Sequence, residues 1–204
     1  MRAVAADRTL ADTLIPDEGA QRLAAQICLA VVGSLLLWAS AKINVPFWPV
    51  KMSMQTFVVM ALAAAYGPRL GVATVLLYLA EGAFGLPVFQ GTPDRGLGLA
   101  YMAGPTGGYL FGFVAATFAI GTLMERSKAG DLPWLFGIML LGDAMIFAFG
   151  FAWLAWFAVL PNGEPGIGAA AAFAGGVAPF ILGDLVKVAL ATCVAAAASR
   201  LVRR

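Results

Sequence analysis

The stretch Gly183-Asp184-Leu185-Val186-Lys187 places a carboxylate and an ammonium inside a run, residues 177–198, that is otherwise almost wholly apolar. The run is long enough to cross a lipid bilayer as one helix. Because Asp184 and Lys187 are three residues apart, a helix brings them to one face, where they can pair. Ionisable side chains at membrane depth mark functional sites by default, so this pair is the first candidate site.

Two purely structural explanations of the pair stay open. The two charges can neutralise each other and join neighbouring helices. Alternatively, Lys187 can extend its apolar stem and carry its ammonium to a membrane interface. Under either explanation the pair binds no ligand.

The composition is that of an integral membrane protein. Of the 204 residues, 61% are hydrophobic and 12% are charged, and the mean hydropathy is +0.88. A net charge of +2, with the basic residues mostly between apolar runs, argues against a nucleic-acid partner. Histidine is absent, and Cys28 and Cys193 lie in different apolar runs without metal-ligand spacing. We therefore expect no metal site, no cofactor and no enzyme.

The apolar runs predict an all-α membrane protein with six transmembrane helices. Residues 1–21 are polar, with charges of both signs, and indicate a cytoplasmic lead rather than a signal peptide. Residues 22–204 are expected to form a single transmembrane domain. Its spans are expected at about residues 23–41, 52–66, 70–82, 104–124, 134–159 and 177–198. Gly67-Pro68-Arg69 predicts a tight turn between the second and third spans, and Pro179 suits the first turn of the last one.

Three features between and within the spans suggest a site. Two prolines interrupt residues 43–50, where Phe47 and Trp48 suit a membrane interface or a lid. Residues 83–104 form the longest segment expected to be non-helical, and their Gly and Pro content suits a cap over a site or a mere connector. Gly107 and Gly108 open the fourth span, where bare backbone favours either close approach of a ligand or tight helix packing.

The basic residues predict the orientation. If both termini are cytoplasmic, nine Lys and Arg residues fall on the inner side and three on the outer side, which agrees with the positive-inside rule. The inner nine are Arg2, Arg8, Arg22, Arg69, Arg126, Lys128, Arg200, Arg203 and Arg204; the outer three are Lys42, Lys51 and Arg95. The unusual loops and the Asp184–Lys187 pair then share the outer side. We expect an outward-facing pocket there, with aromatic walls and a few fixed charges.

Several longer motifs follow one another along residues 42–191. They are Val45-Pro46-Phe47-Trp48-Pro49-Val50, Met54-Gln55-Thr56-Phe57, Gly67-Pro68-Arg69-Leu70-Gly71, Gly85-Leu86-Pro87-Val88-Phe89, Gly104-Pro105-Thr106-Gly107-Gly108-Tyr109, Gly150 with Trp153-Leu154, and Gly183-Asp184-Leu185-Val186-Lys187. In this order they resemble the BioY family, the biotin-specific substrate-binding (S) components of energy-coupling factor transporters. The resemblance implies high-affinity biotin capture at a bacterial cytoplasmic (inner) membrane. It also implies partners: a transmembrane coupling subunit and two ATPase subunits. The absence of a G-x-x-x-x-G-K-[ST] motif from this chain agrees with that division of labour.

The resemblance also implies residue roles. Asp184 is expected to accept a hydrogen bond from a ureido N–H of biotin, and Lys187 to donate one to a ligand oxygen. Weaker candidates for polar contacts are Gln90 and Arg95, the latter for the carboxylate. The pocket floor is assigned to Tyr109 with Gly107 and Gly108, and the lid to Phe47 and Trp48. Plain interfacial anchoring remains the alternative for these aromatic residues.

Two rival functions stay open. A solitary vitamin carrier needs no ATPase, and its ion coupling would fall to Asp143, Asp184 and Lys187. Asp143 itself is expected either to pair with a basic group across helices or to stay protonated. An intramembrane enzyme is disfavoured, since no nucleophile and base are found together.

Overall fold

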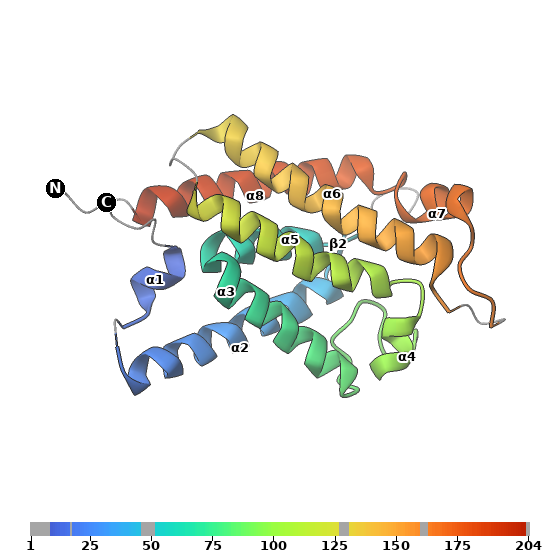
Figure 1. Cartoon of the computed structure of the whole chain (residues 1–204), viewed down its shortest axis with the longest axis horizontal. Helices are drawn as coiled ribbons and strands as arrows, with labels where there is room; N and C mark the ends of the chain where they lie inside the picture. Colours follow the sequence, from blue (N-terminus) through green and yellow to red (C-terminus); the bar gives the residue numbers. More distant parts are fainter. Residues whose placement is uncertain (1–8, 17, 46–51, 127–130, 160–162, 203–204) are drawn as a thin grey trace.

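Long helices lying side by side make up most of the molecule, and a short strand pair follows the first of them (Figure 1). The computed structural model describes residues 9–16, 18–45, 52–126, 131–159 and 163–202. For residues 201 and 202 it describes the backbone alone. The elements in chain order are α1 (Leu10–Leu14), α2 (Ala20–Lys42), β1 (Asn44–Val45), β2 (Met52–Ser53), α3 (Gln55–Ala83), α4 (Gly98–Ala103), α5 (Gly107–Glu125), α6 (Leu132–Trp156), α7 (Ala169–Gly176) and α8 (Ile181–Val202).

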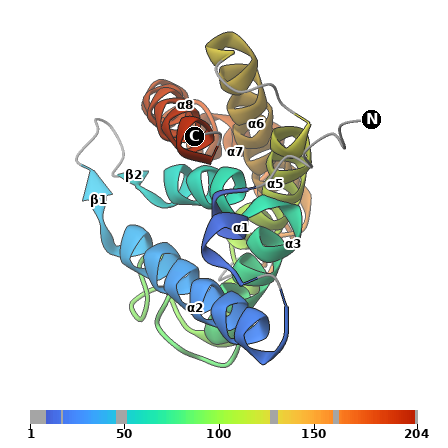
Figure 2. The ribbon, with the colours of Figure 1, turned by 90° about the vertical axis from the view of Figure 1, so that its left-hand side faces the viewer.

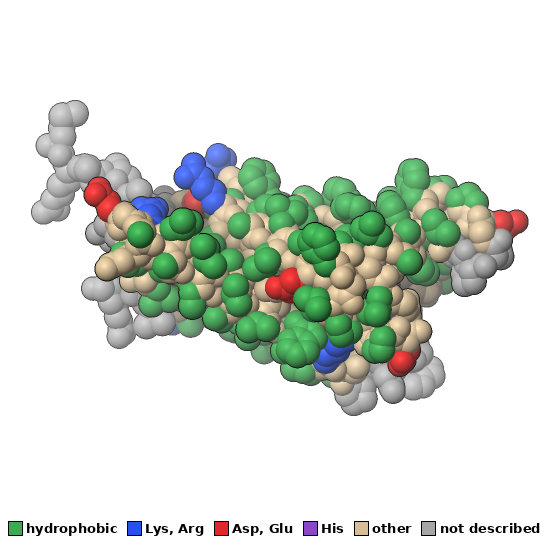
Figure 3. Space-filling model, turned by 90° about the horizontal axis from the view of Figure 1, so that it is seen from below, with side chains coloured by type: hydrophobic (Ala, Val, Ile, Leu, Met, Phe, Trp, Pro, Cys, Tyr) green, Lys and Arg blue, Asp and Glu red, His purple; other side chains and the backbone are tan. Residues whose placement is uncertain are grey.

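The expected all-helical membrane fold is confirmed. Within the described residues, five helices are long and apolar enough to cross a membrane: α2, α3, α5, α6 and α8. Hydrophobic side chains cover most of the face in Figure 3, as contact with lipid requires. The second and third spans expected from the sequence both correspond to α3, which contains the non-helical residue Gly67. The expected start of the second span was wrong, because Met52 and Ser53 form β2.

The chain reverses its direction at Gly67. Gln55 Nε2 donates a hydrogen bond to Tyr78 Oη at 2.7 Å, although the two residues are 23 apart in sequence. An unbroken helix would separate them by about 35 Å. The two halves of α3 therefore run back alongside each other, as Figure 1 shows.

Glycine allows this reversal because the backbone of Gly67 has φ +71° and ψ −177°. A Cβ atom there would also lie 2.8 Å from Thr9 Cγ2. On the other side of the turn, a Cβ on Gly121 of α5 would lie 2.5 Å from the backbone nitrogen of Pro68. The absence of side chains thus lets α5 pack directly against the turn.

The core lies where α3, α5, α6 and α8 meet. Its fully buried members include Val59, Tyr78, Ile120, Ile146 and Val188. In contrast, α2 lies at the edge of the bundle, and its buried residues all come from its second half: Gly33, Ser34, Leu37, Ser40 and Ala41. Polar contacts attach this half to α3, where the Ser34 hydroxyl donates to Glu81.

Several expected boundaries were wrong. The last span begins at Ile181 and not at residue 177, because α7 and a turn containing Pro179 come before it. The fifth span ends at Trp156 instead of residue 159. Residues 83–104 are not wholly non-helical, since α4 lies within them. That short helix is held by Tyr101, which is buried and stacks on Phe89 with ring centroids 4.9 Å apart.

The turn at Gly67 generates a prediction about stability. Gly67→Ala should destabilise the folded chain by about 1–3 kcal/mol, because a side chain is strained in this backbone conformation. Thermal unfolding of the purified chain in detergent measures the change. Gly137→Ala is the matched control, because Gly137 lies inside α6 with open space around it and its replacement should not lower stability. Equal unfolding temperatures for Gly67→Ala and the wild type would contradict the argument.

Candidate functional site

A pocket of about 240 Å³ lies among α3, α5, α6 and α8, beside the loop that leads into α4. Small-molecule sites usually have volumes of about 300–1,000 Å³, so this pocket is slightly smaller than the lower end of that range. Aromatic rings form much of the wall: Tyr101, Tyr109, Phe113, Phe147 and Phe180. The polar groups on the wall are Ser53, Gln55, Thr56, Gln90, Arg95, Thr106, Asp184 and Lys187.

A buried charge pair forms one side of the pocket. Lys187 Nζ lies 2.7 Å from Asp184 Oδ1, and the two side chains are only 8% and 3% exposed. Asp184 lies in the first turn of α8, where the positive end of the helix dipole favours a carboxylate. The expected i, i+3 pairing on one helical face is confirmed.

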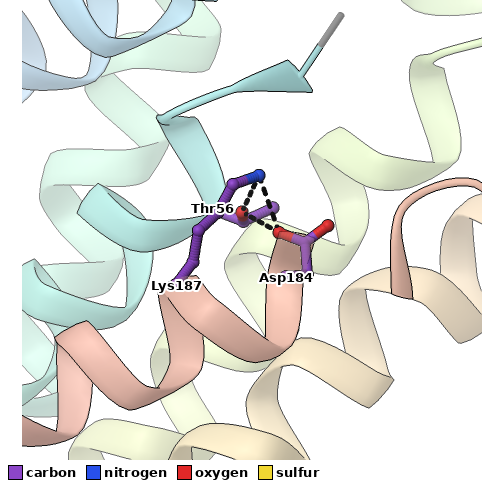
Figure 4. A network of polar contacts seen from close by, with 3 residues as sticks. All are labelled: Thr56, Asp184 and Lys187. Atoms are coloured by element: carbon purple, nitrogen blue, oxygen red, sulfur yellow. Dashed lines mark hydrogen bonds and ion pairs between the residues drawn. The ribbon is translucent and has the colours of Figure 1, made fainter. Parts of the chain in front are cut away.

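Thr56 of α3 joins both members of the pair (Figure 4). Its hydroxyl donates to Asp184 Oδ1 at 2.7 Å and accepts from Lys187 Nζ at 3.2 Å. In the sequence, Thr56 belongs to the motif Met54-Gln55-Thr56-Phe57, but no role was expected for it. No spacing rule could have paired it, since it lies 128 residues from Asp184.

The second oxygen of Asp184 is left for another partner. Both the ion pair and the Thr56 hydrogen bond use Oδ1. Figure 4 shows the other carboxylate oxygen pointing away from Thr56 and Lys187. A carboxylate has lone pairs on both oxygens, so Asp184 can accept a hydrogen bond from a ligand without giving up the pair.

Lys42, at the end of α2, anchors the long loop beside the pocket. Its Nζ donates to the carbonyl oxygens of Phe89 and Thr92, both at 3.0 Å, and to Thr92 Oγ1 at 2.9 Å. Tyr78 Oη donates to the Val88 carbonyl at 3.0 Å, which fixes the same segment from α3. The sequence had indicated Lys42 only as an outer-side topology signal, so this role was missed.

The same loop carries two of the expected site residues. Gln90 lines the pocket, and its carbonyl oxygen accepts from Tyr101 Oη at 2.8 Å. Arg95 also lines the pocket and is exposed. The anchored part of the loop therefore places Gln90 at the pocket wall, whereas Arg95 lies at the solvent-exposed edge of the pocket.

The other expected site residues divide into three groups. Tyr109 lines the pocket, and its hydroxyl donates to the Gly176 carbonyl at 2.7 Å. Gly107 and Gly108 lie in the packing behind the wall: added Cβ atoms would lie 1.9 Å from the Met102 carbonyl oxygen and 2.2 Å from Trp153 Cβ, respectively. This agrees with the tight-packing alternative for the two glycines. Phe47 and Trp48 fall outside the described residues.

Asp143 lies behind the pocket, in the middle of α6. It is 6% exposed, and its Oδ1 atom has no hydrogen-bond partner in the described part of the chain. Asp143 also borders a separate groove of about 410 Å³, otherwise lined by apolar residues of α6, α7 and α8 and of the turn between the last two. Asp143 was expected either to pair with a basic group or to stay protonated. Among the described residues it forms no ion pair.

Comparison with a family model decides the family. The model of the BioY family matches residues 11–204. The chain belongs to the BioY family. This family comprises transporters and not enzymes.

Individual BioY relatives match over most of their length. A probable biotin transporter BioY from Pyrococcus horikoshii is 36% identical over 172 residues, which cover 84% of this chain and 94% of the relative. The biotin transporter BioY of Thermotoga maritima is 32% identical over 170 residues, covering 83% and 93%. A solved structure of the S-component for biotin from an ECF-type ABC transporter superposes with a TM-score of 0.71. It is 22% identical and covers 92% of this chain and 95% of its own, so it supports the fold.

The bridging hydroxyl of Thr56 generates a second prediction. Thr56→Val keeps the shape of the side chain but leaves both buried charges without this partner. The ligand-free chain should lose about 1.5–3 kcal/mol of stability, the range for a hydrogen bond to a charged group. Unfolding in detergent measures the loss. Thr56→Ser keeps the hydroxyl and should retain most of the stability. Equal losses for the two variants would contradict the role assigned to the hydrogen bonds of the Thr56 hydroxyl.

Proposed function

We propose that this chain is the biotin-binding S component of an energy-coupling factor transporter in a bacterial cytoplasmic membrane. The observation that carries the proposal is the pocket wall itself. In a BioY-family chain, Asp184 there keeps one carboxylate oxygen available, beside Lys187 and a set of aromatic rings. Because relatives of this chain are named biotin transporters, biotin is the first ligand to test.

The chemistry of biotin matches this wall. Its ureido ring has two N–H donors and a carbonyl, its thioether ring is apolar, and its side chain ends in a carboxylate. Asp184 accepts from a ureido N–H through its second oxygen, and Lys187 donates to a ligand oxygen. Arg95, at the margin of the pocket, meets the carboxylate. Tyr109 and Phe180 contact the apolar ring.

The membrane topology that fits this function has six crossings with both termini in the cytoplasm. The reversal at Gly67 makes two crossings of α3. The nine-to-three distribution of Lys and Arg supports the orientation. In that orientation the pocket opens to the outside, where the vitamin is captured.

Energy for transport comes from other subunits in this proposal. The sequence has no P-loop for ATP binding, so a coupling subunit and two ATPases complete the transporter. Tight capture by the isolated chain then needs no nucleotide, because binding and energy conversion reside in different proteins.

A solitary biotin carrier is the second candidate, and Asp143 favours it. This buried carboxylate lies within a membrane-spanning helix of the same bundle as Asp184 and Lys187, and ionisable groups at that depth are suited to ion coupling. Uptake of biotin by cells that hold this chain but no coupling module would establish the second candidate in place of the first.

The direct test is binding of labelled biotin to the purified chain in detergent. We expect binding without nucleotide and no change on addition of ATP. Asp184→Asn and Lys187→Met should each weaken binding by about 2–5 kcal/mol, the range for truncating one member of a buried charged pair. A requirement for ATP, or a failure to bind biotin, would contradict the proposed function.

The double variant separates a ligand site from a structural pair. Each single change leaves one buried charge unpaired and so lowers stability as well as binding. Asp184→Asn combined with Lys187→Met removes both charges and should restore stability. A stable double variant that no longer binds biotin supports the ligand roles of Asp184 and Lys187. Near-native affinity in that variant would show that the two residues serve only to join helices.

Trypsin provides a test of the long loop, because Arg95 is the one Lys or Arg among residues 83–104. Saturating biotin should slow cleavage after Arg95 several-fold, since a ligand held by that side chain restrains the loop margin. Cleavage after Arg126, an exposed residue at the end of α5 and outside the pocket, is the internal control. Equal rates after Arg95 with and without biotin would leave the loop as a connector.

A further inference from the structure

The loop between α3 and α4 is held by contacts that lie outside the pocket. Residues 84–97 connect the two helices, and Figure 2 shows this loop, in green, on the same side of the bundle as α2. Arg95, which lines the pocket, is the residue of this loop proposed to meet the carboxylate of biotin. Its guanidinium makes no ion pair or hydrogen bond with the described part of the chain. It is therefore available to an anionic ligand.

Gly91 gives the side chain of Arg95 a surface to lie on. The backbone nitrogen of Arg95 donates to the Gly91 carbonyl at 2.9 Å, which closes a turn between the two residues. Gly91 has φ +75°, a conformation that favours glycine. A Cβ atom on Gly91 would lie 2.7 Å from Arg95 Cδ and 3.0 Å from Arg95 Nε. The arginine side chain therefore passes over the bare backbone of Gly91.

Lys42 holds the same turn from the end of α2. Its Nζ donates to the carbonyl oxygens of Phe89 and Thr92, each at 3.0 Å, and Gly91 lies between these two residues. The Thr92 hydroxyl accepts a third hydrogen bond from Nζ at 2.9 Å. An ammonium has three N–H donors, so the three hydrogen bonds to the loop match its capacity. Lys42 itself is not among the residues that line the pocket.

The two ends of the turn are held in different ways. Phe89 is 1% exposed and stacks on Tyr101, so core packing fixes the first end. Among the described residues, Lys42 is the one side chain outside the loop that makes hydrogen bonds to residues 91–95. The part of the turn that carries Arg95 therefore depends on Lys42.

We propose that Lys42 is a positioning residue for the ligand carboxylate, through which the chain selects free biotin over amide-linked biotin. This role rests on the biotin-binding function proposed above. By fixing the turn, Lys42 holds the Arg95 guanidinium at the pocket edge, where it pairs with a carboxylate. An amide in the same place is neutral and forms no ion pair with Arg95. Release of the turn then costs the acid its advantage over the amide.

The affinities of the purified chain in detergent for biotin and for biotinamide test this role. The two ligands share the ureido and thioether rings, so the ratio of their dissociation constants isolates the carboxylate. We expect the wild type to prefer biotin by about fivefold, the size of a solvent-exposed ion pair. Lys42→Met and Arg95→Gln should each bring the ratio close to one. Combining them should change the ratio no further, because Lys42 acts through Arg95.

Trypsin cleavage of the ligand-free chain reports on the turn itself and needs no biotin. Cleavage after Arg95 should be several-fold faster in Lys42→Met than in the wild type, because a released turn opens locally more often. Cleavage after Arg126 is the internal control and should be unchanged. Arg200→Gln is the matched charge control, because Arg200 is exposed on α8 and outside both the loop and the pocket. It should keep the wild-type ratio and cleavage rates.

The outcomes separate this role from the proposed function. A wild-type ratio in Lys42→Met, or unchanged cleavage after Arg95 in that variant, would overturn the positioning role. An equal loss of the ratio in Arg200→Gln would show an effect of net charge and would also overturn it. A wild-type chain that binds biotin and biotinamide equally would refute the selectivity but leave biotin binding in place. A wild-type chain that binds neither ligand would refute the proposed function and this role with it.

Discussion

The ion pair between Asp184 and Lys187 determines how distant parts of the chain meet. Neither charge is tolerable alone in an apolar bundle, so each requires a partner and further hydrogen bonds. The helical spacing on α8 supplies the partner, and Thr56 supplies the hydrogen bonds from α3. The start of α3 is therefore held against the start of α8. The pocket forms where these two helix starts meet the aromatic residues of α5 and α6.

The reversal at Gly67 makes that meeting compatible with a compact bundle. It returns the second half of α3 along the first, so that Tyr78 reaches both Gln55 and the Val88 carbonyl. The loop after α3 is consequently fixed near the pocket by hydrogen bonds from Tyr78 and Lys42. Gly121 allows α5 to approach the turn closely, which sets the other wall. One glycine conformation thus positions the loop and two helices around the site.

Local patterns in the sequence predicted the features that depend on neighbouring residues. The i, i+3 spacing placed Asp184 and Lys187 on one face, and Gly67-Pro68-Arg69 located the reversal. Features that depend on tertiary contacts were not accessible. Thr56 and Lys42 act on groups 128 and 47 to 50 residues away, and no periodicity records such distances. The start of α8 was misplaced for a similar reason, because an Ala- and Gly-rich run does not show where α7 ends and α8 begins.

The structural and ligand-binding explanations of the charge pair do not exclude each other. The structural one requires that Asp184 and Lys187 neutralise each other, and Oδ1 alone satisfies it. The proposed ligand role requires an acceptor at the pocket wall, and the second oxygen of the same carboxylate provides it. Because Thr56 and Lys187 hold Oδ1, the second oxygen is held in a fixed direction before any ligand arrives, which lowers the entropy lost on binding. The contacts that make the charges tolerable within the membrane are thus the same contacts that orient the site.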